Sequence, residues 1–251
     1  LAVWTRRSES LPSLRAALPK AEVGTEPELA RSSDLVVLAA PPAVLPELVR
    51  AILPYLSPST LVTDVSSVKE SVERSVAPLL QGKARWIGSH PMAGSENSGL
   101  GAARTGLFQN APVILTPTAS TSSATTRDVS SFWQALGARI LTMSPQSHDE
   151  QVARISHLPH LISSALVLAA GKKPLPLAGP GYRDTTRIAA GPSELWSEIL
   201  LENRREILAA LKDFRSSVDA LASALDQENT QSLQKILDEA AGIRRNLSPS
   251  S

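Results

Sequence analysis

The stretch DLVVLAAPPAVLPELVRAILPYLSPSTLVTDVSS, residues 34–67, contains two short apolar runs with a helical pattern between them. The runs at 34–40 and 60–67 are rich in Val and Leu and do not alternate strictly, which is typical of strands buried on both faces of a parallel sheet. Between them, residues 42–56 repeat apolar side chains at the spacing of one helical face. A strand, a helix and a second strand in this order predict a doubly wound α/β fold.

The same alternation of strand and helix patterns extends to about residue 144, after which the pattern is helical. A Pro- and Gly-rich connector at 171–193 interrupts the helices. We therefore expect an α/β domain over residues 1–144 and an all-α domain over residues 145–251. Pro159 should kink or break the first helix of the second domain, because proline has no backbone N–H. The remaining predicted strands cover 1–4, 84–90, 112–117 and 138–143, and the remaining predicted helices cover 66–80, 149–171, 194–225 and 229–247.

Composition excludes several classes of protein. The chain has 251 residues, and 42% of them are hydrophobic, which suffices to bury a core and argues against disorder. With 25 Lys and Arg against 24 Asp and Glu the net charge is +1, so we expect no nucleic-acid or membrane partner. Without cysteine the chain has no disulfide, no thiolate zinc site and no cysteine nucleophile. The longest apolar stretch, 161–171, is too short to cross a bilayer. The absence of cysteine fits the cytoplasmic location that we expect.

Candidate ligand-binding residues lie at the carboxyl ends of the predicted strands. In a doubly wound sheet, ligands bind in the crevice outside these ends, so the groups there should line one edge of the sheet. They are Thr5, Arg6 and Arg7 after the first strand, Ala40 and Pro41 at the second, Ser66 and Ser67 at the third, and His90 at the fourth.

Four segments in order carry a resemblance to a known family. DVSSVK (64–69), GSHPMAGSENSG (88–99), HDEQVARISHLPH (148–160) and GYRDTTRIAAGPSELW (181–196) together resemble the prephenate/arogenate dehydrogenase (TyrA) family across both predicted domains. The resemblance implies an NAD(P)-binding Rossmann-type domain followed by a helical dimerisation domain, and a homodimer. It also implies oxidative decarboxylation of prephenate or arogenate, with hydride transfer to NAD(P), in tyrosine biosynthesis.

Individual residues match the site residues of that family. His90 matches the catalytic histidine, and an imidazole that titrates near neutral pH suits a general base. Ser67 matches the serine that hydrogen-bonds the reacting hydroxyl and the nicotinamide; the alternative is a helix N-cap, which Ser66 could also supply. Arg187 matches the arginine that grips a substrate carboxylate through both oxygens. The other expected substrate contacts are His160, Glu96, Arg183 and Tyr182.

The remaining histidines and one tryptophan have structural interpretations. His157 and His160 lie three residues apart on one helical face, but no HExxH motif or further acidic ligand accompanies them, so we expect no metal. His157 could equally be a packed residue behind the site. His148 is interpreted as part of a helix start, and Trp196 as a residue of the core or an interface.

The end of the first predicted strand bears on the choice of cofactor. An acidic side chain at this position binds the adenosine ribose and selects NAD. This chain has Thr5, Arg6 and Arg7 there, with no acid before Glu9. A threonine hydroxyl and a guanidinium can bind a 2′-phosphate, so NADP is favoured over NAD. No residue decides between prephenate and arogenate.

The chain departs from the family at its beginning. The family opens with a strand, a GxGxxG turn and a helix, whereas the numbered chain starts at what resembles the family's second strand. We therefore expect the numbered sequence to be an incomplete view of the molecule. Two alternatives stay open: another two-domain NAD(P)-dependent dehydrogenase, or a non-catalytic fragment that binds prephenate or dimerises.

Overall fold

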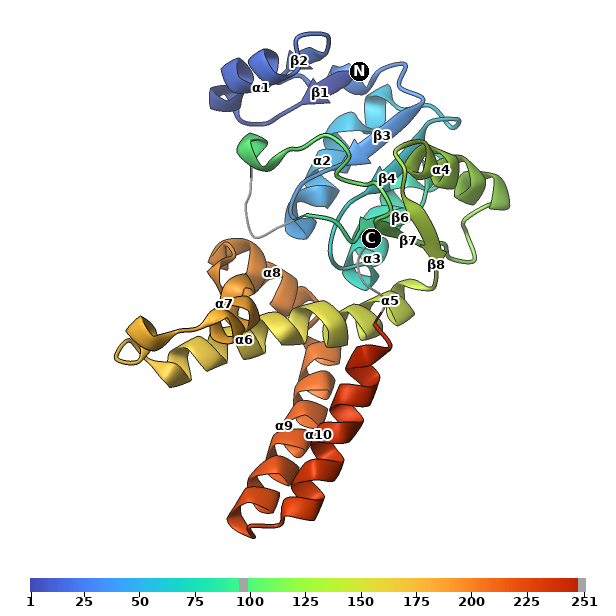
Figure 1. Ribbon diagram of the computed structural model, residues 1–251. Helices are drawn as coiled ribbons and strands as arrows, with labels where there is room; N and C mark the ends of the chain where they lie inside the picture. Colours follow the sequence, from blue (N-terminus) through green and yellow to red (C-terminus); the bar gives the residue numbers. More distant parts are fainter. Residues whose placement is uncertain (95–98, 248–251) are drawn as a thin grey trace. The chain divides into compact units, whose positions relative to one another are not determined.

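A computed structural model describes residues 1–94 and 99–247, and it divides into two compact units (Figure 1). Unit 1 is Leu1–Asn203, and unit 2 is Arg204–Ser251. The α/β elements and the first helices after them both belong to unit 1.

The strands of unit 1 form three small sheets in the described part of the chain. The first pairs β1 (Ala2–Trp4) with β2 (Glu22–Gly24), and the second has the order β3 (Leu35–Leu38), β4 (Leu61–Asp64), β5 (Arg85–Trp86), with every pairing parallel. In the third, β7 (Pro112–Thr116) pairs antiparallel with β6 (Gly88–Pro91) and parallel with β8 (Arg139–Thr142). The parallel pairing expected from the apolar runs is thus confirmed for β3 and β4, whereas β6 runs against its neighbour.

Unit 1 has helices where the sequence predicted them, but α1 (Leu11–Ala17), α4 (Ser123–Ala135) and α7 (Pro180–Thr186) lie outside the predicted helical ranges. The apolar face expected over 42–56 is buried on α2, where Leu45, Leu48, Val49 and Ile52 belong to the core. Ser122 caps α4 by accepting a hydrogen bond from the backbone of Thr125. The α-helices of unit 1 are α1 Leu11–Ala17, α2 Leu45–Ile52, α3 Glu70–Leu80, α4 Ser123–Ala135, α5 Pro145–Val152, α6 Leu158–Ala170, α7 Pro180–Thr186 and α8 Ser193–Glu202.

Short 3-10 turns connect many of these elements. They are η1 Ser8–Ser10, η2 Pro27–Ala30, η3 Pro42–Val44, η4 Leu53–Tyr55, η5 Leu100–Ala102, η7 Leu175–Leu177 and η8 Arg187–Ala190.

Two apolar clusters hold unit 1 together. The larger one lies between α2, α3 and strands β3 to β5, and Ile199 of α8 is buried in it with Trp196 packed against it. The second joins β7 and Ile87, the residue directly before β6, to α4, with Trp133 as its largest buried side chain. Because α8 contributes to the first cluster, α8 is fixed to the α/β part by hydrophobic burial.

One helical run, Pro145–Ala170, comprises α5, a π-helical segment at Ala153–His157 and α6. Pro159 lies in the first turn of α6, directly after the π-segment, so the helix is interrupted where the proline predicted an irregularity. By length and composition alone this run could span a membrane. Its buried His148, Asp149 and His160 contact other parts of unit 1.

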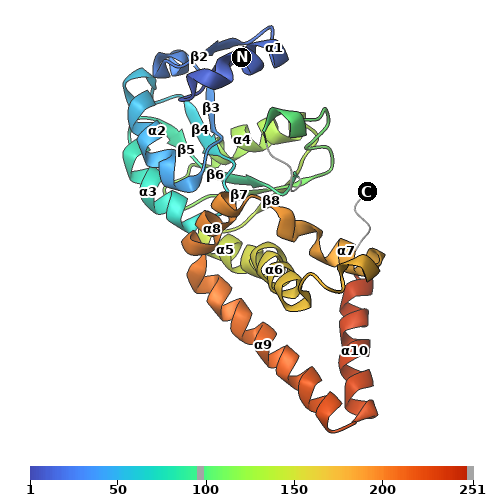
Figure 2. The ribbon, with the colours of Figure 1, turned by 90° about the vertical axis from the view of Figure 1, so that its left-hand side faces the viewer.

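Unit 2 is a helical hairpin of α9 (Arg204–Asp226) and α10 (Thr230–Arg245), visible as the two long C-terminal helices in Figure 2. The Asn229 side chain caps α10 by accepting from the backbone of Ser232 at 2.9 Å. The single helix expected over 194–225 is instead divided into α8 and α9, with Asn203 between them.

Candidate active site

His90 lies on β6 and is buried. Its backbone is fixed in the antiparallel ladder opposite Ile114 of β7. The side chain reaches α5, where His90 Nδ1 lies 2.8 Å from His148 Nε2, with the two rings edge to face. The histidine that the sequence places after a strand is therefore held by an element 58 residues further along the chain.

A continuous chain of hydrogen bonds extends from His90 through His148 to Asp149, and we call these three residues the relay. His148 Nδ1 lies 2.7 Å from Asp149 Oδ1. The Asp149 carboxylate also accepts from the backbone N–H groups of Lys69 at 2.8 Å and Glu70 at 2.9 Å. These two groups stand at the start of α3, where the helix leaves N–H groups unpaired and where its dipole favours a negative charge.

The partners along the relay determine which ring nitrogens carry protons. An ionised Asp149 only accepts, so His148 Nδ1 must donate to it. A neutral His148 then offers an unprotonated Nε2, which accepts from His90 Nδ1–H. His90 is left with an unprotonated Nε2, and this nitrogen can take a proton from a ligand.

Burial keeps the histidines of the relay neutral. Burial lowers the pKa of His90 well below its usual 6.5, and the proximity of His148 and of Lys69 acts in the same direction. Burial also lowers the pKa of His148, although the Asp149 carboxylate opposes this shift. At neutral pH the relay therefore contains two neutral imidazoles, and His90 is poised as a base.

A buried ion pair fixes the loop that precedes α3. The Lys69 ammonium pairs with the Asp64 carboxylate and donates to the Ser89 carbonyl at 2.8 Å. Asp64 also accepts from the backbone of Ser66 at 2.9 Å and of Ser89 at 3.1 Å. Burial lowers the pKa of Lys69, while the adjacent Asp64 carboxylate opposes that change. The residue directly before His90 is thus tied to the carboxyl end of β4.

Two other histidines belong to the same helical run as His148. His160 stacks on Trp196 with ring centroids 3.7 Å apart, and burial lowers its pKa. His157 is fully buried, and burial lowers its pKa to about 4. Among the described residues, His157 Nε2 and His160 Nδ1 are buried without a hydrogen-bond partner. All four histidines of the chain thus gather in unit 1 as buried groups.

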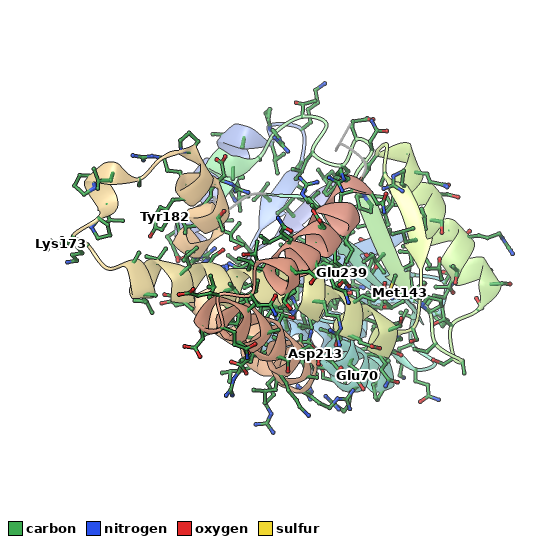
Figure 3. All side chains as sticks on the ribbon, turned by 60° about the horizontal axis from the view of Figure 1, so that its bottom comes forward. Glu70, Met143, Lys173, Tyr182, Asp213 and Glu239 are labelled. Atoms are coloured by element: carbon green, nitrogen blue, oxygen red, sulfur yellow. The ribbon has the colours of Figure 1, made fainter. Side chains whose placement is uncertain are left out.

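The predicted substrate-binding residues of the connector line one pocket. Tyr182, Arg183 and Arg187 border a cavity of about 470 Å³, together with Leu175, Ala178, Thr186 and Ala190. The Tyr182 hydroxyl is buried and has no hydrogen-bond partner among the described residues. Figure 3 labels Tyr182 on α7 and Lys173 on the projecting loop that leads to it. Glu96 lies outside the described residues.

Contacts of α6 with α7 and with the residue after η8 place this pocket near His160. The Ser163 hydroxyl donates to the Thr185 carbonyl at 2.7 Å, which holds α7 against α6. Gly191, which follows η8, lies so close to Trp196 and His160 that a Cβ there would stand 2.6 Å from the indole nitrogen. The connector therefore packs against the helix that carries His157 and His160.

The predicted cofactor residues follow the carboxyl ends of β1, β3 and β4. An ion pair of 3.1 Å between Arg6 and Glu47 of α2 holds the loop after β1 beside the helix that follows β3. Arg7 is exposed, and its backbone donates to the Thr5 hydroxyl at 3.2 Å. Ala40 and Pro41 form the turn into η3, between β3 and α2.

The serines after β4 complete this edge. Ser66 Oγ is buried with no hydrogen-bond partner among the described residues, whereas Ser67 is half-buried. Neither residue is the N-cap of α3, which is Lys69 and makes no side-chain capping bond. Neither hydroxyl is therefore used to cap α3.

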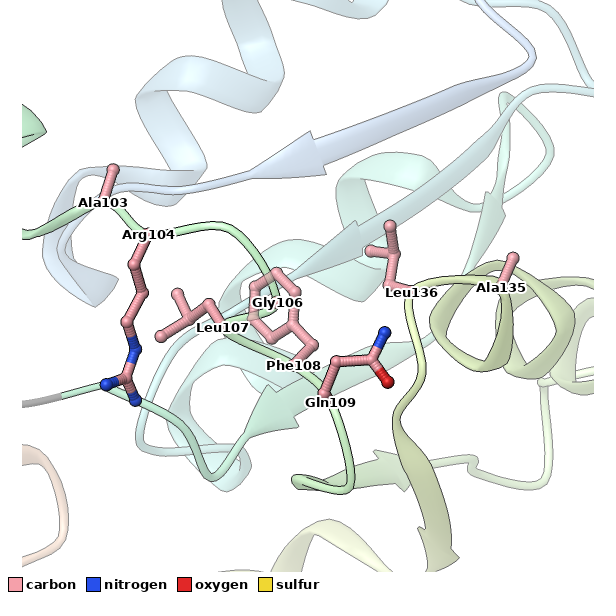
Figure 4. A pocket seen from close by; sticks show the side chains of 8 residues that line it. All are labelled: Ala103, Arg104, Gly106, Leu107, Phe108, Gln109, Ala135 and Leu136. Atoms are coloured by element: carbon pink, nitrogen blue, oxygen red, sulfur yellow. The ribbon is translucent and has the colours of Figure 1, made fainter.

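A second cavity, of about 340 Å³, lies beside the C-terminal end of α4 (Figure 4). It contains none of the site residues predicted from the sequence. The lining residues are Ala103, Arg104, Gly106, Leu107, Phe108, Gln109, Ala135 and Leu136.

Three polar residues around His90 were not identified from the sequence. His148 was interpreted as a helix start, which is where it lies, but its ring also contacts His90. Asp149 and Lys69 gave no signal as isolated charged residues. Their burial in contact with one another depends on α5 packing against the start of α3, and this long-range contact has no local pattern.

Comparison with known proteins identifies both parts of the chain. A model described as prephenate dehydrogenase, nucleotide-binding domain, matches residues 15–142, and one described as prephenate dehydrogenase, dimerization domain, matches residues 144–239. A cyclohexadienyl dehydrogenase of Zymomonas mobilis is 34% identical over 85% of this chain and 75% of its own length. A crystal structure of prephenate dehydrogenase from A. aeolicus with hydroxyphenyl propionate and NAD+ has a TM-score of 0.88 at 28% identity, covering 98% of this chain and 88% of the other.

The chain is shorter than some of these relatives. A prephenate dehydrogenase of Lactococcus lactis is 32% identical over 86% of this chain, which spans 61% of the length of that protein. The matches nevertheless run through both parts of the chain in order. The fold is a nucleotide-binding α/β domain followed by a helical dimerisation domain.

Proposed function

Because the chain belongs to the prephenate dehydrogenase family, we propose that it catalyses the oxidative decarboxylation of prephenate or arogenate in tyrosine biosynthesis, with hydride transfer to NAD(P)+. In this reaction the ring carbinol loses a hydride and its hydroxyl loses a proton, while the ring carboxylate leaves as carbon dioxide. The product ring is aromatic, which drives the reaction. The protein has to supply a base for the hydroxyl and cationic or hydrogen-bonding groups for the carboxylates.

The relay is the observation that carries this proposal. His90 Nε2 takes the proton of the ring hydroxyl, while His148 and Asp149 hold the imidazole in the tautomer that leaves this nitrogen free. The positive charge that forms on His90 is stabilised through His148 by the Asp149 carboxylate. Ser67, at the adjacent end of β4, donates or accepts a hydrogen bond at the same hydroxyl.

The substrate's side chain would lie toward the helices α6 and α7. Arg187 pairs with a substrate carboxylate, and its guanidinium can engage both oxygens. Tyr182 and Arg183 border the same pocket and shape its polar rim. His160, stacked on Trp196, contributes a ring nitrogen that is buried without a partner. Glu96, which follows β6 in the sequence, would be a further substrate contact.

The residues at the sheet edge fit a nicotinamide dinucleotide. The unpartnered Ser66 hydroxyl, the half-buried Ser67 and the Ala40–Pro41 turn offer polar atoms and a close backbone approach. When bound, this cofactor supplies the hydride acceptor. Thr5, Arg6 and Arg7 would hold the adenosine end, and their charge favours NADP over NAD because two guanidinium groups suit a 2′-phosphate.

The helical part would also mediate assembly. We propose that the domain boundary lies between residues 144 and 145, directly before α5, and that the chain forms a homodimer in the cytoplasm through its helices. Large apolar side chains on these helices stand exposed, including Leu168 at 81% and Ile243 at 67%. Exposed apolar surface of this kind marks association sites. A monomer in sedimentation at micromolar concentration would contradict the dimer.

The test of the proposed activity is the His90→Asn variant. Its kcat should fall by about 10²–10⁴-fold, the usual contribution of a general base, while its affinity for the dinucleotide stays unchanged. Initial rates with prephenate and arogenate, each with NAD+ and NADP+, would also identify the preferred pair. Asp128→Asn, at an exposed ion pair with Arg85, is the control and should leave every rate unchanged. A wild-type chain that oxidises neither substrate would exclude the proposed reaction.

A further inference from the structure

Asn203 is a buried amide at the junction between α8 and α9. It is the last residue of unit 1, and its side chain makes two hydrogen bonds inside that unit. Its Nδ2 donates to the backbone carbonyl of Asp149 at 2.8 Å and lies 3.1 Å from His157 Nδ1. One amide group therefore contacts both the acidic end of the relay and the buried histidine of the π-segment.

The carbonyl of Asp149 settles the orientation of this amide. A carbonyl oxygen only accepts, so the amide nitrogen and not the amide oxygen must face it. The second hydrogen of the same nitrogen points to His157 Nδ1, which must then be the unprotonated nitrogen of that ring. The proton of neutral His157 consequently sits on Nε2, which is buried without a partner among the described residues.

We propose that Asn203 is a positioning residue that selects the Nε2–H tautomer of His157 and anchors the backbone of Asp149. The inference rests on the proposed function, since the relay and His157 matter to catalysis only if the chain oxidises its substrate at His90. Asn203 touches neither substrate nor cofactor and acts through the groups it holds. It leaves His157 with its N–H donor on Nε2, a buried atom without a partner among the described residues, and it holds the backbone of the residue that ends the relay.

The chemistry of Asn203 is specific to an amide. Asn203→Asp has almost the same shape, but its carboxylate oxygens cannot donate to the Asp149 carbonyl. The carboxylate instead accepts from His157, which draws the proton of that ring to Nδ1. Asn203→Ala removes both hydrogen bonds and leaves the His157 ring free to take either tautomer. The matched control is Asn229→Asp, where the side chain caps α10 through its oxygen and an aspartate can do the same.

Nitrogen-15 spectra of histidine side chains test the tautomer directly. The chain has four histidines, so selective labelling yields four imidazole patterns, and His157→Gln identifies the one from His157. We expect the wild-type protein to show His157 protonated at Nε2, Asn203→Asp to move the proton to Nδ1 or to charge the ring, and Asn229→Asp to leave the pattern unchanged. A wild-type His157 protonated at Nδ1 overturns the proposal, whether or not any variant folds.

Kinetics distinguish this proposal from the proposed function. Loss of one buried hydrogen bond should lower the kcat of Asn203→Asp by about tenfold, with the KM for the dinucleotide unchanged. Unfolding midpoints of all variants serve as the control for folding. If the wild-type chain has no dehydrogenase activity but His157 shows the expected tautomer, only the proposed function fails. If the wild-type chain is active and Asn203→Asp keeps the wild-type tautomer and rate, the positioning role fails.

Discussion

Replacing Asp149 by asparagine tests the relay without changing the shape of the site. Oδ1 accepts from Lys69 N and His148 Nδ1, and Oδ2 accepts from Glu70 N. Asparagine keeps one acceptor oxygen and replaces the other by an NH2 group that only donates. If that NH2 group faces His148, Nδ1 of His148 must accept, and the proton moves to its Nε2. His90 then has to accept at Nδ1 and carry its own proton at Nε2, where it can no longer act as a base.

The magnitude follows from the bonds that change. The opposite amide orientation keeps the relay intact but sets the NH2 group against the backbone N–H of Glu70 at the start of α3. Either orientation loses one backbone hydrogen bond, from Lys69 N or from Glu70 N, and both lose the carboxylate charge that stabilises the cation on His90. Hydrogen bonds to charged groups contribute about 1.5–3 kcal/mol, and the charge-assisted bond from His148 is the one whose loss lowers kcat. At about 1.4 kcal/mol per factor of ten, we expect kcat to fall by about 10- to 150-fold.

Steady-state rates at saturating substrate and dinucleotide, measured across about pH 6–9, give kcat for Asp149→Asn and the wild-type protein. The KM for the dinucleotide should stay within about twofold, because Asp149 contacts helix α3 and His148 rather than the cofactor edge. Asp128→Asn again serves as the control for a surface carboxylate. A folded Asp149→Asn protein that keeps more than half of the wild-type kcat throughout this range would show that the relay does not set the base.

Four further predictions follow from the same structure. Arg187→Ala should raise the KM for the substrate by about tenfold or more, because a charge-assisted hydrogen bond contributes about 1.5–3 kcal/mol; an unchanged KM would remove Arg187 from the carboxylate site. Replacing Arg6 and Arg7 by alanine should raise the KM for NADP+ much more than for NAD+, and a wild-type preference for NAD+ in kcat/KM would contradict the NADP assignment. The acidic limb of the kcat/KM profile should lie below pH 6.5, because burial lowers the pKa of His90, and a limb above that value would count against it. Since the folded pKa of His157 is about 4 against 6.5 when unfolded, the unfolded chain binds its proton first. The contribution of neutral His157 to the free energy of unfolding should therefore be fully present above pH 6.5 and fall by about 3 kcal/mol as the pH drops to about 4. Denaturant titrations of His157→Gln should show a smaller loss of stability over the same pH range.

The sequence predicted those features that depend on local patterns. Apolar periodicity located α2 and the buried strands β3 and β4, and Pro159 marked the irregular part of the long helix. The short strand β2 was not predicted, because Glu22–Gly24 has a single buried apolar residue and no visible pattern. The antiparallel direction of β6 was also missed, since no α-helix of the described residues crosses between β6 and β7 and the run at 84–90 gives no direction.

The site was predictable in its types of residue but not in its connections. The position of His90 after a strand and the resemblance to a family both pointed to this histidine, yet neither could show what orients its ring. That depends on His148 and Asp149 meeting the start of α3, a contact between residues about 80 positions apart. Asn203 is a similar case. One asparagine within a helical pattern looks like any exposed polar residue, and the sequence does not show that α8 ends directly before it and α9 begins directly after it.

The π-segment at Ala153–His157 changes the directions in which the side chains of the long helix point. A π-turn amounts to one residue inserted into an α-helix, and one residue turns everything beyond it by roughly 100°. His148 and His157 are nine positions apart, and in an unbroken α-helix they would point to roughly opposite sides. The inserted residue therefore turns the side of the helix that carries His157 and His160 toward the side that carries the relay. Deleting a single codon, such as that of the exposed Ile155, would place His148 and His157 one position closer, and in a regular helix this spacing gives the same rotation, roughly 80°, that the inserted residue gives now. Such a deletion is therefore expected to remove the π-segment and still keep the two faces in phase.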